Sequence, residues 1–386
     1  MENSNLQTLL ADVSNRWMGH GGPITKGPYK PVEKLIAAFE MTRPLLSTIG
    51  PPLAGAGAVL SIGGIPSIPK IIIGSFCVLI ATFGIHTFND WIDRERDKEA
   101  WPMRAIPTGR VYPKVAFILS ISYFIISIVL TFFFINKTTS VILLIALTLG
   151  ILYTMHFRDR VGYLSLPFII GLFPIGGWAA FSPETLFRSP LPWILYAMAW
   201  LWQAGHIMVH SAGHPVKEVD GKRITEIKGF FFATTPNLSA ILGLIFLLLT
   251  FFLSIILFFI TPLGYLYLTF SIVSGIYVLI PSIRLLQDPE NKIKSLTAFN
   301  GASKYLVILS SGIIIDIFVH AVIWEYIVSS FAFLKLHFGL WLWPLLFAGI
   351  ATIIGLIFVA IFTLNLAVKH IMKRKDFAVK KPLMRG

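Results

Sequence analysis

Uninterrupted apolar runs constrain the fold of this chain more than any other feature of its sequence. Each run has the length of about 20 residues that an α-helix needs to cross the hydrocarbon core of a bilayer. Only 13% of the 386 residues are charged and 55% are hydrophobic, whereas soluble domains carry about 25% charged residues. We therefore predict an all-α, polytopic integral membrane protein with helices near residues 43–63, 70–89, 113–136, 138–156, 162–182, 191–213, 236–260, 262–284, 301–323 and 340–368.

The Lys and Arg residues predict how these helices are oriented. With the connections assigned alternately to the two sides, all but four of the 32 Lys and Arg residues fall on the side that holds both termini. Because basic connections stay in the cytoplasm, the termini and the connections after the second, fourth, sixth and eighth helices are expected to be cytoplasmic. The net charge of +13 is accounted for by this topology and by membrane lipid headgroups, so nucleic acid is not expected as a partner.

Three regions follow from this pattern. Residues 1–42 form a tail with an interfacial helix, residues 43–325 form the transmembrane domain, and residues 326–386 add a further transmembrane helix and a basic cytoplasmic tail. Apolar residues at helical spacing mark the interfacial helix: Val32, Leu35, Ile36 and Phe39. The single cysteine excludes an internal disulfide, and the N-terminal sequence lacks the pattern of a cleaved signal peptide.

Acidic residues gather at the end of the second apolar run, in the sequence FNDWIDRERDKEAWPMRAIPTGR at 88–110. If the helix continues one or two turns past its apolar part, it carries polar side chains on successive turns of one face: Asn89, Asp90, Asp93 and Asp97. Hard divalent cations prefer carboxylate oxygens, and Mg²⁺ is usually held by one or two carboxylates together with phosphates. The alternative is a solvated cap that is neutralised by its basic neighbours Arg94, Arg96 and Lys98.

Two arginines, Arg104 and Arg110, bracket a turn directly after the acidic residues. Carboxylates for a metal beside arginines for oxyanions are what a diphosphate group requires. The whole stretch resembles the first aspartate-rich motif of the UbiA superfamily of intramembrane prenyltransferases, N-D-x-x-D-x-x-x-D followed by R-x-I-P-x-G-R. The stretch MTRPLLSTIGPPLAGAG, with Arg43 at its cytoplasmic end, is similar to the family's first helix. Tyr153, Arg158 and Arg160 match positions where a tyrosine and basic residues approach the substrate.

The resemblance implies a bundle of nine helices around a central cavity, beside which 340–368 is a tenth helix. It also implies Mg²⁺-dependent transfer of a prenyl group from an isoprenoid diphosphate, through an allylic carbocation, to a hydrophobic or aromatic acceptor that the sequence does not identify. The aspartates Asp90 and Asp93 and the cation-facing Tyr153 would be catalytic. Basic residues would join Asn89 in binding the diphosphate: Arg43, Arg104, Arg110, Arg158, Lys217 and Arg223.

The family's second acidic motif is altered in this chain. In HPVKEVDGKRITEIKGF, Pro215 stands in place of the first aspartate, Glu218 of the second and Lys222 of the last. Glu218 and Asp220 remain as cation ligands beside the first motif, so we expect one Mg²⁺ ion rather than two. Lys222 is then expected to take part in catalysis, because a lysine ammonium is a compact charge that contacts phosphate without carboxylate ligands.

Histidines recur at intervals of four residues along the sixth predicted helix: His206, His210 and His214. With His86 of the second helix, they predict a polar cavity. The imidazoles are interpreted as neutral groups that form hydrogen bonds there; ligation of Zn²⁺ and general-base catalysis are the alternatives. Asp316, in the ninth helix, is expected to form an internal hydrogen bond. Two further functions stay open, a terpene cyclase that needs no acceptor and a non-catalytic protein that binds a polyprenyl lipid.

Overall fold

The computed structural model describes residues 12–22, 27–214, 216–219, 222–225 and 234–324. The chain divides into two units, Met1–Ala321 and Val322–Gly386, and the first of them holds the helix bundle. The predicted tenth helix, the C-terminal tail and Asp220 lie outside the described residues, and for Lys222 and Arg223 the structure describes the backbone alone.

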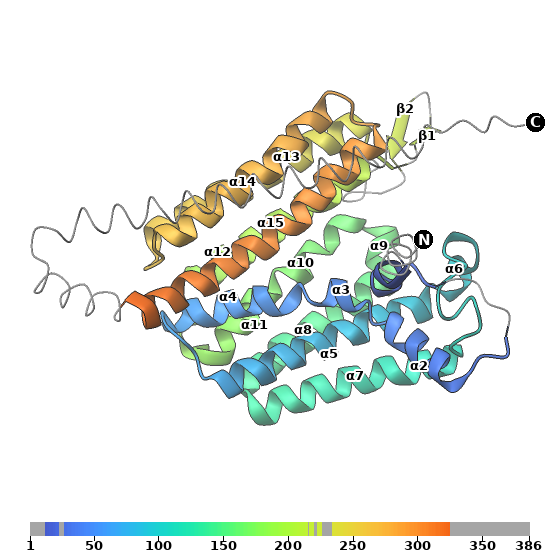
Figure 1. The fold of residues 1–386 in the computed structure, drawn as a ribbon, viewed down its shortest axis with the longest axis horizontal. Helices are drawn as coiled ribbons and strands as arrows, with labels where there is room; N and C mark the ends of the chain where they lie inside the picture. The colour runs from blue at the N-terminus through green and yellow to red at the C-terminus, as the bar shows by residue number, and fades with distance from the viewer. Residues whose placement is uncertain (1–11, 23–26, 215, 220–221, 226–233, 325–386) are drawn as a thin grey trace, which may run out of the picture. The chain divides into compact units, whose positions relative to one another are not determined.

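The first nine predicted spans each coincide with a helix in the described part of the chain (Figure 1). These helices are α4 (Gly50–Ile62), α5 (Ile68–Ile92), α7 (Pro113–Phe134), α8 (Lys137–Leu152), α11 (Leu172–Phe181), α12 (Leu191–Ala212), α13 (Pro236–Ile260), α14 (Tyr265–Leu286) and α15 (Lys292–Phe318). Seven helical runs among the described residues are long and apolar enough to cross a membrane, and a pair bent by 41° at the first span would be an eighth. The helix at the sixth predicted span, α12, is not among these runs. The expectation of an all-α integral membrane protein is confirmed.

Prolines mark the starts of several helices, and one residue, Asp93, both ends α5 and begins the helix that follows it. The helices α4, α5, α7 and α13 each carry proline in their first turn, where the missing N–H has no partner to lose. At its other end α5 stops at Ile92, and Asp93 leads directly into α6 (Arg94–Ala100). The backbone stays nearly helical across this junction, because the Asp97 N–H donates to the Asp93 carbonyl at 2.8 Å. The predicted continuation past the apolar part is therefore observed.

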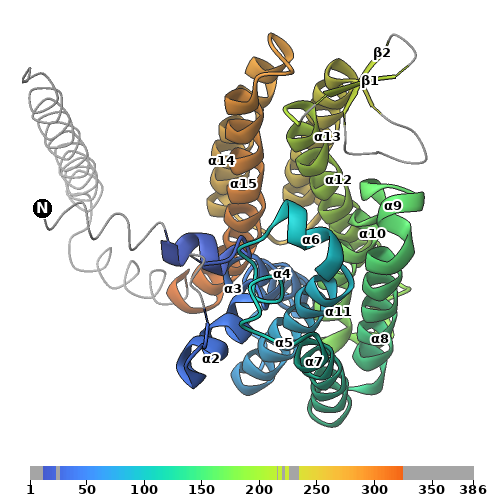
Figure 2. The ribbon, with the colours of Figure 1, turned by 90° about the vertical axis from the view of Figure 1, so that its right-hand side faces the viewer.

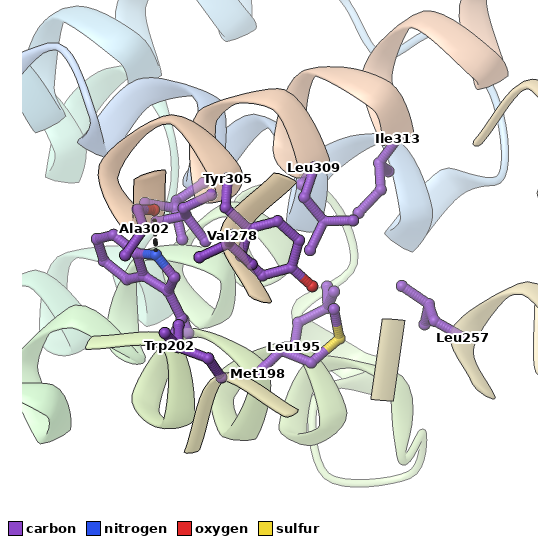
Figure 3. Packing of buried hydrophobic residues seen from close by; sticks show 14 of the residues in the cluster. Leu195, Met198, Trp202, Leu257, Val278, Ala302, Tyr305, Leu309 and Ile313 are labelled. Atoms are coloured by element: carbon purple, nitrogen blue, oxygen red, sulfur yellow. Dashed lines mark hydrogen bonds between the residues drawn. The ribbon is translucent and has the colours of Figure 1, made fainter. Parts of the chain in front are cut away.

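Within this unit some helices pack against a neighbour in sequence, and others pack against a helix from a distant part of the chain. Close pairs are α5 with α7, α4 with α11, α12 with α13, and α14 with α15. One hydrophobic core joins α4, α11 and α12 to α15. Figure 3 shows Tyr305 and Leu309 of α15 facing Met198 of α12, and the Trp202 Nε1–H donates to the Ala302 carbonyl at 2.7 Å. These contacts hold α12 against α15, and the shared core places both helices against α4.

Glycine allows α4 and α11 to approach each other closely. A Cβ atom on Gly177 would lie 1.8 Å from the Ala54 carbonyl oxygen, and one on Gly57 would lie 2.1 Å from that of Pro174. Small residues at a membrane helix contact let two backbones come near enough for dense packing. The position of α11 against α4 therefore depends on the absence of a side chain at these two positions.

Short elements gather at one end of the helices, as both views of the ribbon show (Figures 1 and 2). Those labelled there are α2 (Pro31–Glu40), α3 (Pro44–Ser47), α6, α9 (Arg158–Arg160) and a hairpin of β1 (Val216–Val219) and β2 (Lys222–Thr225). The π-helix η1 (Tyr153–Phe157) leads directly into α9. The hairpin is a local exception in an otherwise helical fold. Its strands are antiparallel, with Glu218 opposite Arg223.

Asp316 shows how a buried carboxylate is accommodated at the opposite end. Its oxygens accept hydrogen bonds from the backbone N–H groups of Gly264, at 2.7 Å, and Tyr267, at 3.0 Å. These N–H groups begin α14 and have no partner within the helix. The predicted internal hydrogen bond of Asp316 is confirmed, and its role is to cap α14.

Candidate active site

Three carboxylates are buried where α5 passes into α6. The exposed fractions of Asp90, Asp93 and Asp97 are 4%, 5% and 1%, although aspartate is rarely so deeply buried unless it is paired. Each of the three is paired with an arginine from another segment of the chain. The three carboxylates are therefore not solvated, although one of the basic neighbours named in the alternative of a solvated cap, Arg96, also pairs with Asp93.

Asp90 is paired with Arg43, which precedes α3. One nitrogen of Arg43, Nη2, donates to Asp90 Oδ1 at 2.6 Å and to Asn89 Oδ1 at 3.1 Å. Arg43 has a φ of 47°, which is uncommon for a residue other than glycine and points to a conformation imposed by its surroundings. Its Nε atom is buried without a hydrogen-bond partner. The residue can therefore donate a further hydrogen bond to a negatively charged ligand.

Asp93 is held by Arg158, the first residue of α9. Arg158 donates to both carboxylate oxygens at 2.7 Å, and Arg96 adds a third hydrogen bond of 2.7 Å. Directly before Arg158 the chain forms the π-helix η1, which begins at Tyr153. Such a widened turn is frequent at functional sites. Tyr153 is half-buried and lies on the same short segment as the arginine.

Asp97 shares its arginine with Asp90. Arg104 Nη1 lies 2.8 Å from Asp97 Oδ2 and 3.6 Å from Asp90 Oδ1. The other oxygen of Asp97, Oδ1, is buried and accepts no hydrogen bond. Burial raises the pKa of the Asp97 carboxyl above its ordinary value, while the charge of Arg104 acts in the opposite direction. An unpartnered buried carboxylate oxygen is a candidate cation ligand, because such a group is costly to bury alone.

The carboxylates of this cluster do not surround a common position that a cation could occupy. In the described ranges no three His, Cys, Asp or Glu side chains are arranged to hold a metal ion. Most of their oxygens accept hydrogen bonds from arginines, whereas Asp97 Oδ1 accepts none. Carboxylate oxygens are the ligands that Mg²⁺ prefers. The residue types and the orphaned oxygen fit Mg²⁺, on the condition that the arginines move to another anion.

Arg110 lies apart from this cluster. Its Nη1 donates to Glu40 Oε2 at 2.8 Å, and its Nη2 donates to the Met103 carbonyl at 2.9 Å. Glu40 also accepts from Arg16 Nη1 at 2.9 Å. Glu40 was not expected in this region, because an acidic residue at the end of an amphipathic helix gives no signal of burial in the sequence.

The second motif is described only in part. Lys217 and Glu218 are exposed side chains of β1. Lys222 and Arg223 belong to β2, whose register places Arg223 opposite Glu218 and Lys222 opposite Val219. Both segments lie at the end of the helices that also holds α6 and α9 (Figure 2).

The histidines of α12 face α15. The ring of His206 stacks on Trp202, with centroids 5.2 Å apart, and lies 4.1 Å from the ring of Phe299. His210 also contacts Phe299, at 4.5 Å, and the ring of His214 lies 4.5 Å from that of His210. His206 and His210 lie on one face of α12, and His214 follows the end of the helix. The first two rings pack against an aromatic side chain, and the buried His206 Nδ1 has no hydrogen-bond partner, so the hydrogen bonding expected for these histidines is not observed at His206.

His86 of α5 lies against the segment around α3. Its Nδ1 atom is 3.0 Å from Ser47 Oγ and 3.1 Å from the Thr42 carbonyl oxygen. His86 is therefore part of a hydrogen-bonded network, as the sequence predicted. It also ties α5 to the residues on either side of Arg43.

The fold and the site together define an integral membrane enzyme with a buried cluster of carboxylates and arginines at the ends of its helices. The chain belongs to the UbiA prenyltransferase family, whose model matches residues 50–303. The enzyme class expected from the sequence, a prenyltransferase, is confirmed.

Known relatives match this chain to different extents. The protoheme IX farnesyltransferase of Synechocystis sp. is 24% identical over 72% of this chain and 88% of its own length. The digeranylgeranylglyceryl phosphate synthase of Methanosphaera stadtmanae is 36% identical over 28% of this chain, and the match spans only 40% of that relative.

Two solved structures are similar in fold. One, of a digeranylgeranylglyceryl phosphate synthase, has a TM-score of 0.56 and 19% identity, covering 74% of this chain and 99% of its own. The other is a UbiA homolog from Aeropyrum pernix K1, with a TM-score of 0.55 and 18% identity, covering 70% of this chain and 98% of its own. At these identities the similarity establishes the fold.

Proposed function

We propose that this protein transfers a prenyl group from an isoprenoid diphosphate to an acceptor within the membrane, in a reaction that depends on Mg²⁺. The observation that carries the proposal is the set of ion pairs between three buried carboxylates and arginines from three other segments. A diphosphate with its metal needs both kinds of group, carboxylates for the cation and arginines for the oxyanion. Membership of the UbiA prenyltransferase family supports the same substrate class.

Binding of the donor would exchange partners within the cluster. Arg43, Arg104 and Arg158 would turn from the carboxylates to the diphosphate oxygens, because a diphosphate offers them more negative charge than a single carboxylate. The carboxylates released in this way would hold the cation with Asn89, as the set Asn89, Asp90, Asp93 and Asp97. The buried Arg43 Nε–H, which lacks an acceptor, supports this assignment because it can donate to an oxyanion at once.

The proposed reaction begins with loss of the negatively charged diphosphate from the donor. The bond between the prenyl carbon and the diphosphate oxygen breaks, the electron pair stays on the diphosphate, and an allylic carbocation remains. The metal would supply positive charge that stabilises the departing diphosphate. The face of Tyr153 would attract the carbocation by about 0.5–2 kcal/mol. A nucleophilic atom of the acceptor forms the new bond and releases its proton.

The altered second motif supports one Mg²⁺ ion rather than two. Two positions at which the family's motif has aspartate are Pro215 and Lys222 here, so Glu218 and Asp220 are the acids left for a cation. Lys217, Lys222 and Arg223 would instead contact the diphosphate directly. Arg110 would act indirectly, because its guanidinium is bound to Glu40.

We infer that this site is cytoplasmic and that α2 lies at the lipid surface, with the boundaries 1–42, 43–325 and 326–386 between the three regions. One face of α2 is apolar and exposed, through Val32, Leu35, Ile36 and Phe39. A test of the orientation places single cysteines at Glu99 and Arg188 in a Cys77→Ser background. An impermeant reagent should label Glu99→Cys from the cytoplasm and Arg188→Cys from the opposite side; the reverse result would overturn the orientation.

The function is tested by incubating the purified protein with geranyl, farnesyl and geranylgeranyl diphosphates and Mg²⁺. Acceptors would include protoheme IX and a prenylated glyceryl phosphate, which the names of the relatives suggest. A prenylated acceptor would support the proposal. A cyclic hydrocarbon formed without acceptor would indicate a terpene cyclase, and no diphosphate release with any donor would indicate a non-catalytic lipid-binding protein.

A further inference from the structure

A buried carboxylate outside the acidic motif connects two segments that both reach the proposed diphosphate site. Glu40 is the last residue of α2, and only 3% of its surface is exposed. Its two oxygens bind different arginines: Oε1 accepts from Arg16 at 2.9 Å and Oε2 from Arg110 at 2.8 Å. Glu40 and Arg16 precede the residues that match the family model. This arrangement is therefore built in part from residues that the family match does not include.

The first connection runs through the loop between α6 and α7. Arg110 Nη2 donates to the Met103 carbonyl at 2.9 Å, and its Nε donates to Thr108 Oγ1 at 3.0 Å. Thr108 Oγ1 donates in turn to the Arg104 carbonyl at 2.8 Å. The pair of Glu40 with Arg110 thus fixes the backbone on both sides of Arg104.

The second connection runs through the N-terminal segment Asp12–Gly22. Arg16, held by Glu40, begins a turn in which the Gly19 N–H donates to the Arg16 carbonyl at 3.0 Å. The Gly19 carbonyl accepts from Arg104 Nε at 3.0 Å. Gly21 lies directly on the Met103 backbone, because a Cβ atom there would be 2.1 Å from the Met103 carbonyl oxygen.

Both connections end on the same side chain. The Nε of Arg104 is held by Gly19, its backbone is held through Arg110, and its Nη1 faces Asp97 at 2.8 Å. An arginine that contacts a phosphate contributes most when its planar group is already oriented. We propose that Glu40 is a positioning residue: by holding these two segments together it keeps the Arg104 guanidinium beside the acidic cluster, where its Nη atoms can pass from Asp97 to the diphosphate of the donor. This inference rests on the proposed function.

The test uses Glu40→Gln in the full chain, reconstituted in lipid nanodiscs. Binding of inorganic diphosphate in the presence of Mg²⁺ is measured by calorimetry, and KM and kcat for a prenyl diphosphate by product formation. We expect diphosphate binding to weaken at least about tenfold, the scale of one charge-assisted hydrogen bond. KM should rise by a similar factor and kcat should change less, because Glu40 touches neither the donor nor Asp90. Unchanged binding and KM would overturn the proposal.

A second measurement does not depend on substrate. Hydrogen–deuterium exchange in Glu40→Gln should rise in residues 16–22 and 101–110 together, while α12 and α15 keep the exchange of the unaltered protein. A rise in only one segment, or in neither, would overturn the inference. If the unaltered protein binds no diphosphate, the proposed function is wrong, and the exchange data still decide whether Glu40 holds both segments.

Two variants complete the design. Arg16→Gln removes only one ion pair from Glu40 and is the variant to measure if Glu40→Gln does not fold. It should raise hydrogen–deuterium exchange in the two segments and weaken diphosphate binding, both to a lesser degree than Glu40→Gln. Glu95→Gln is the matched control, since Glu95 is exposed and paired with Lys98 on α6. It should leave binding and exchange unchanged. A loss of binding in Glu95→Gln equal to that in Glu40→Gln would contradict a specific role for Glu40.

Discussion

Arg158 binds both oxygens of Asp93, at 2.7 Å each, and thereby joins the end of α5 to the segment that follows α8. Both side chains are buried. Two parallel hydrogen bonds of this kind match the planar guanidinium group, which lysine cannot reproduce. The same geometry fits a phosphate, so the pair suits an arginine that exchanges a carboxylate for a diphosphate.

The first prediction is that Arg158→Lys impairs the reaction although the charge is kept. Removing one preorganised electrostatic contact typically costs about 10²–10³ in rate; with the charge retained we expect at least a tenfold loss of kcat/KM. The measurement is diphosphate release under steady-state conditions. Arg188→Lys is the control, because Arg188 is exposed and lies on the other side in the predicted topology. Equal activity of Arg158→Lys and the unaltered protein would contradict the exchange of partners.

The second prediction concerns the orphaned oxygen of Asp97. Asp97→Asn keeps the shape of the side chain but removes the negative charge that we assign to the cation. The Mg²⁺ concentration for half-maximal binding of inorganic diphosphate should rise at least about tenfold, because a neutral amide is a weaker ligand for a hard cation. Calorimetric titration with Mg²⁺ at fixed diphosphate measures this change. An unaltered Mg²⁺ dependence would remove Asp97 from the cation site.

The helix spans and the acidic face could be predicted because each depends only on residues that are close together in the sequence. An apolar run near 70–89 defines a span by its length, and the spacing of Asp90, Asp93 and Asp97 defines a face by the helical repeat. The partners of these aspartates are different. Arg158 is 65 residues from Asp93 in sequence, and no spacing connects the two, so only the family resemblance suggested that Arg158 belongs to the site.

Two other features were not predicted, one although its signal is local and one because it depends on tertiary contacts. The dipeptide Asp220–Gly221 between two four-residue strands is a hairpin signal, but the stretch was interpreted only as an acidic motif. The period of α12 correctly placed His206 and His210 on one face. That Phe299 packs against this face depends on tertiary contacts that a single sequence does not contain.

The third prediction compares two adjacent glycines of α11. A Cβ atom on Gly177 would overlap the Ala54 carbonyl oxygen at 1.8 Å, whereas one on Gly176 would lie 3.8 Å from Ile142. Gly177→Ala should therefore destabilise the protein by about 1–3 kcal/mol, the usual cost of overpacking, and lower its melting temperature in detergent. Gly176→Ala is the matched control and should melt at or above the temperature of the unaltered protein, because alanine favours the helix. Equal melting of the two variants would contradict the close contact of α4 with α11.

The last prediction concerns Lys222, which stands where the family's second motif has its final aspartate. Lys222 begins β2, opposite Val219 and one residue before Arg223. If lysine replaces a second metal ion, Lys222→Ala should weaken diphosphate binding, because one positive charge close to the oxyanion is lost.

The variant Lys222→Asp distinguishes replacement of a metal ion by lysine from a two-metal site that has lost some of its ligands. With Pro215 in place of another aspartate, the new carboxylate would lack the ligands that complete a cation site and would instead repel the diphosphate beside Glu218 and Asp220. We therefore expect Lys222→Asp to be weaker than Lys222→Ala at every Mg²⁺ concentration, as measured by diphosphate release across a Mg²⁺ titration. Lys137→Ala, which removes an exposed lysine on the other side of the predicted topology, is the control. If Lys222→Asp overtakes the unaltered protein as Mg²⁺ rises, the site binds a second metal and lysine does not replace it.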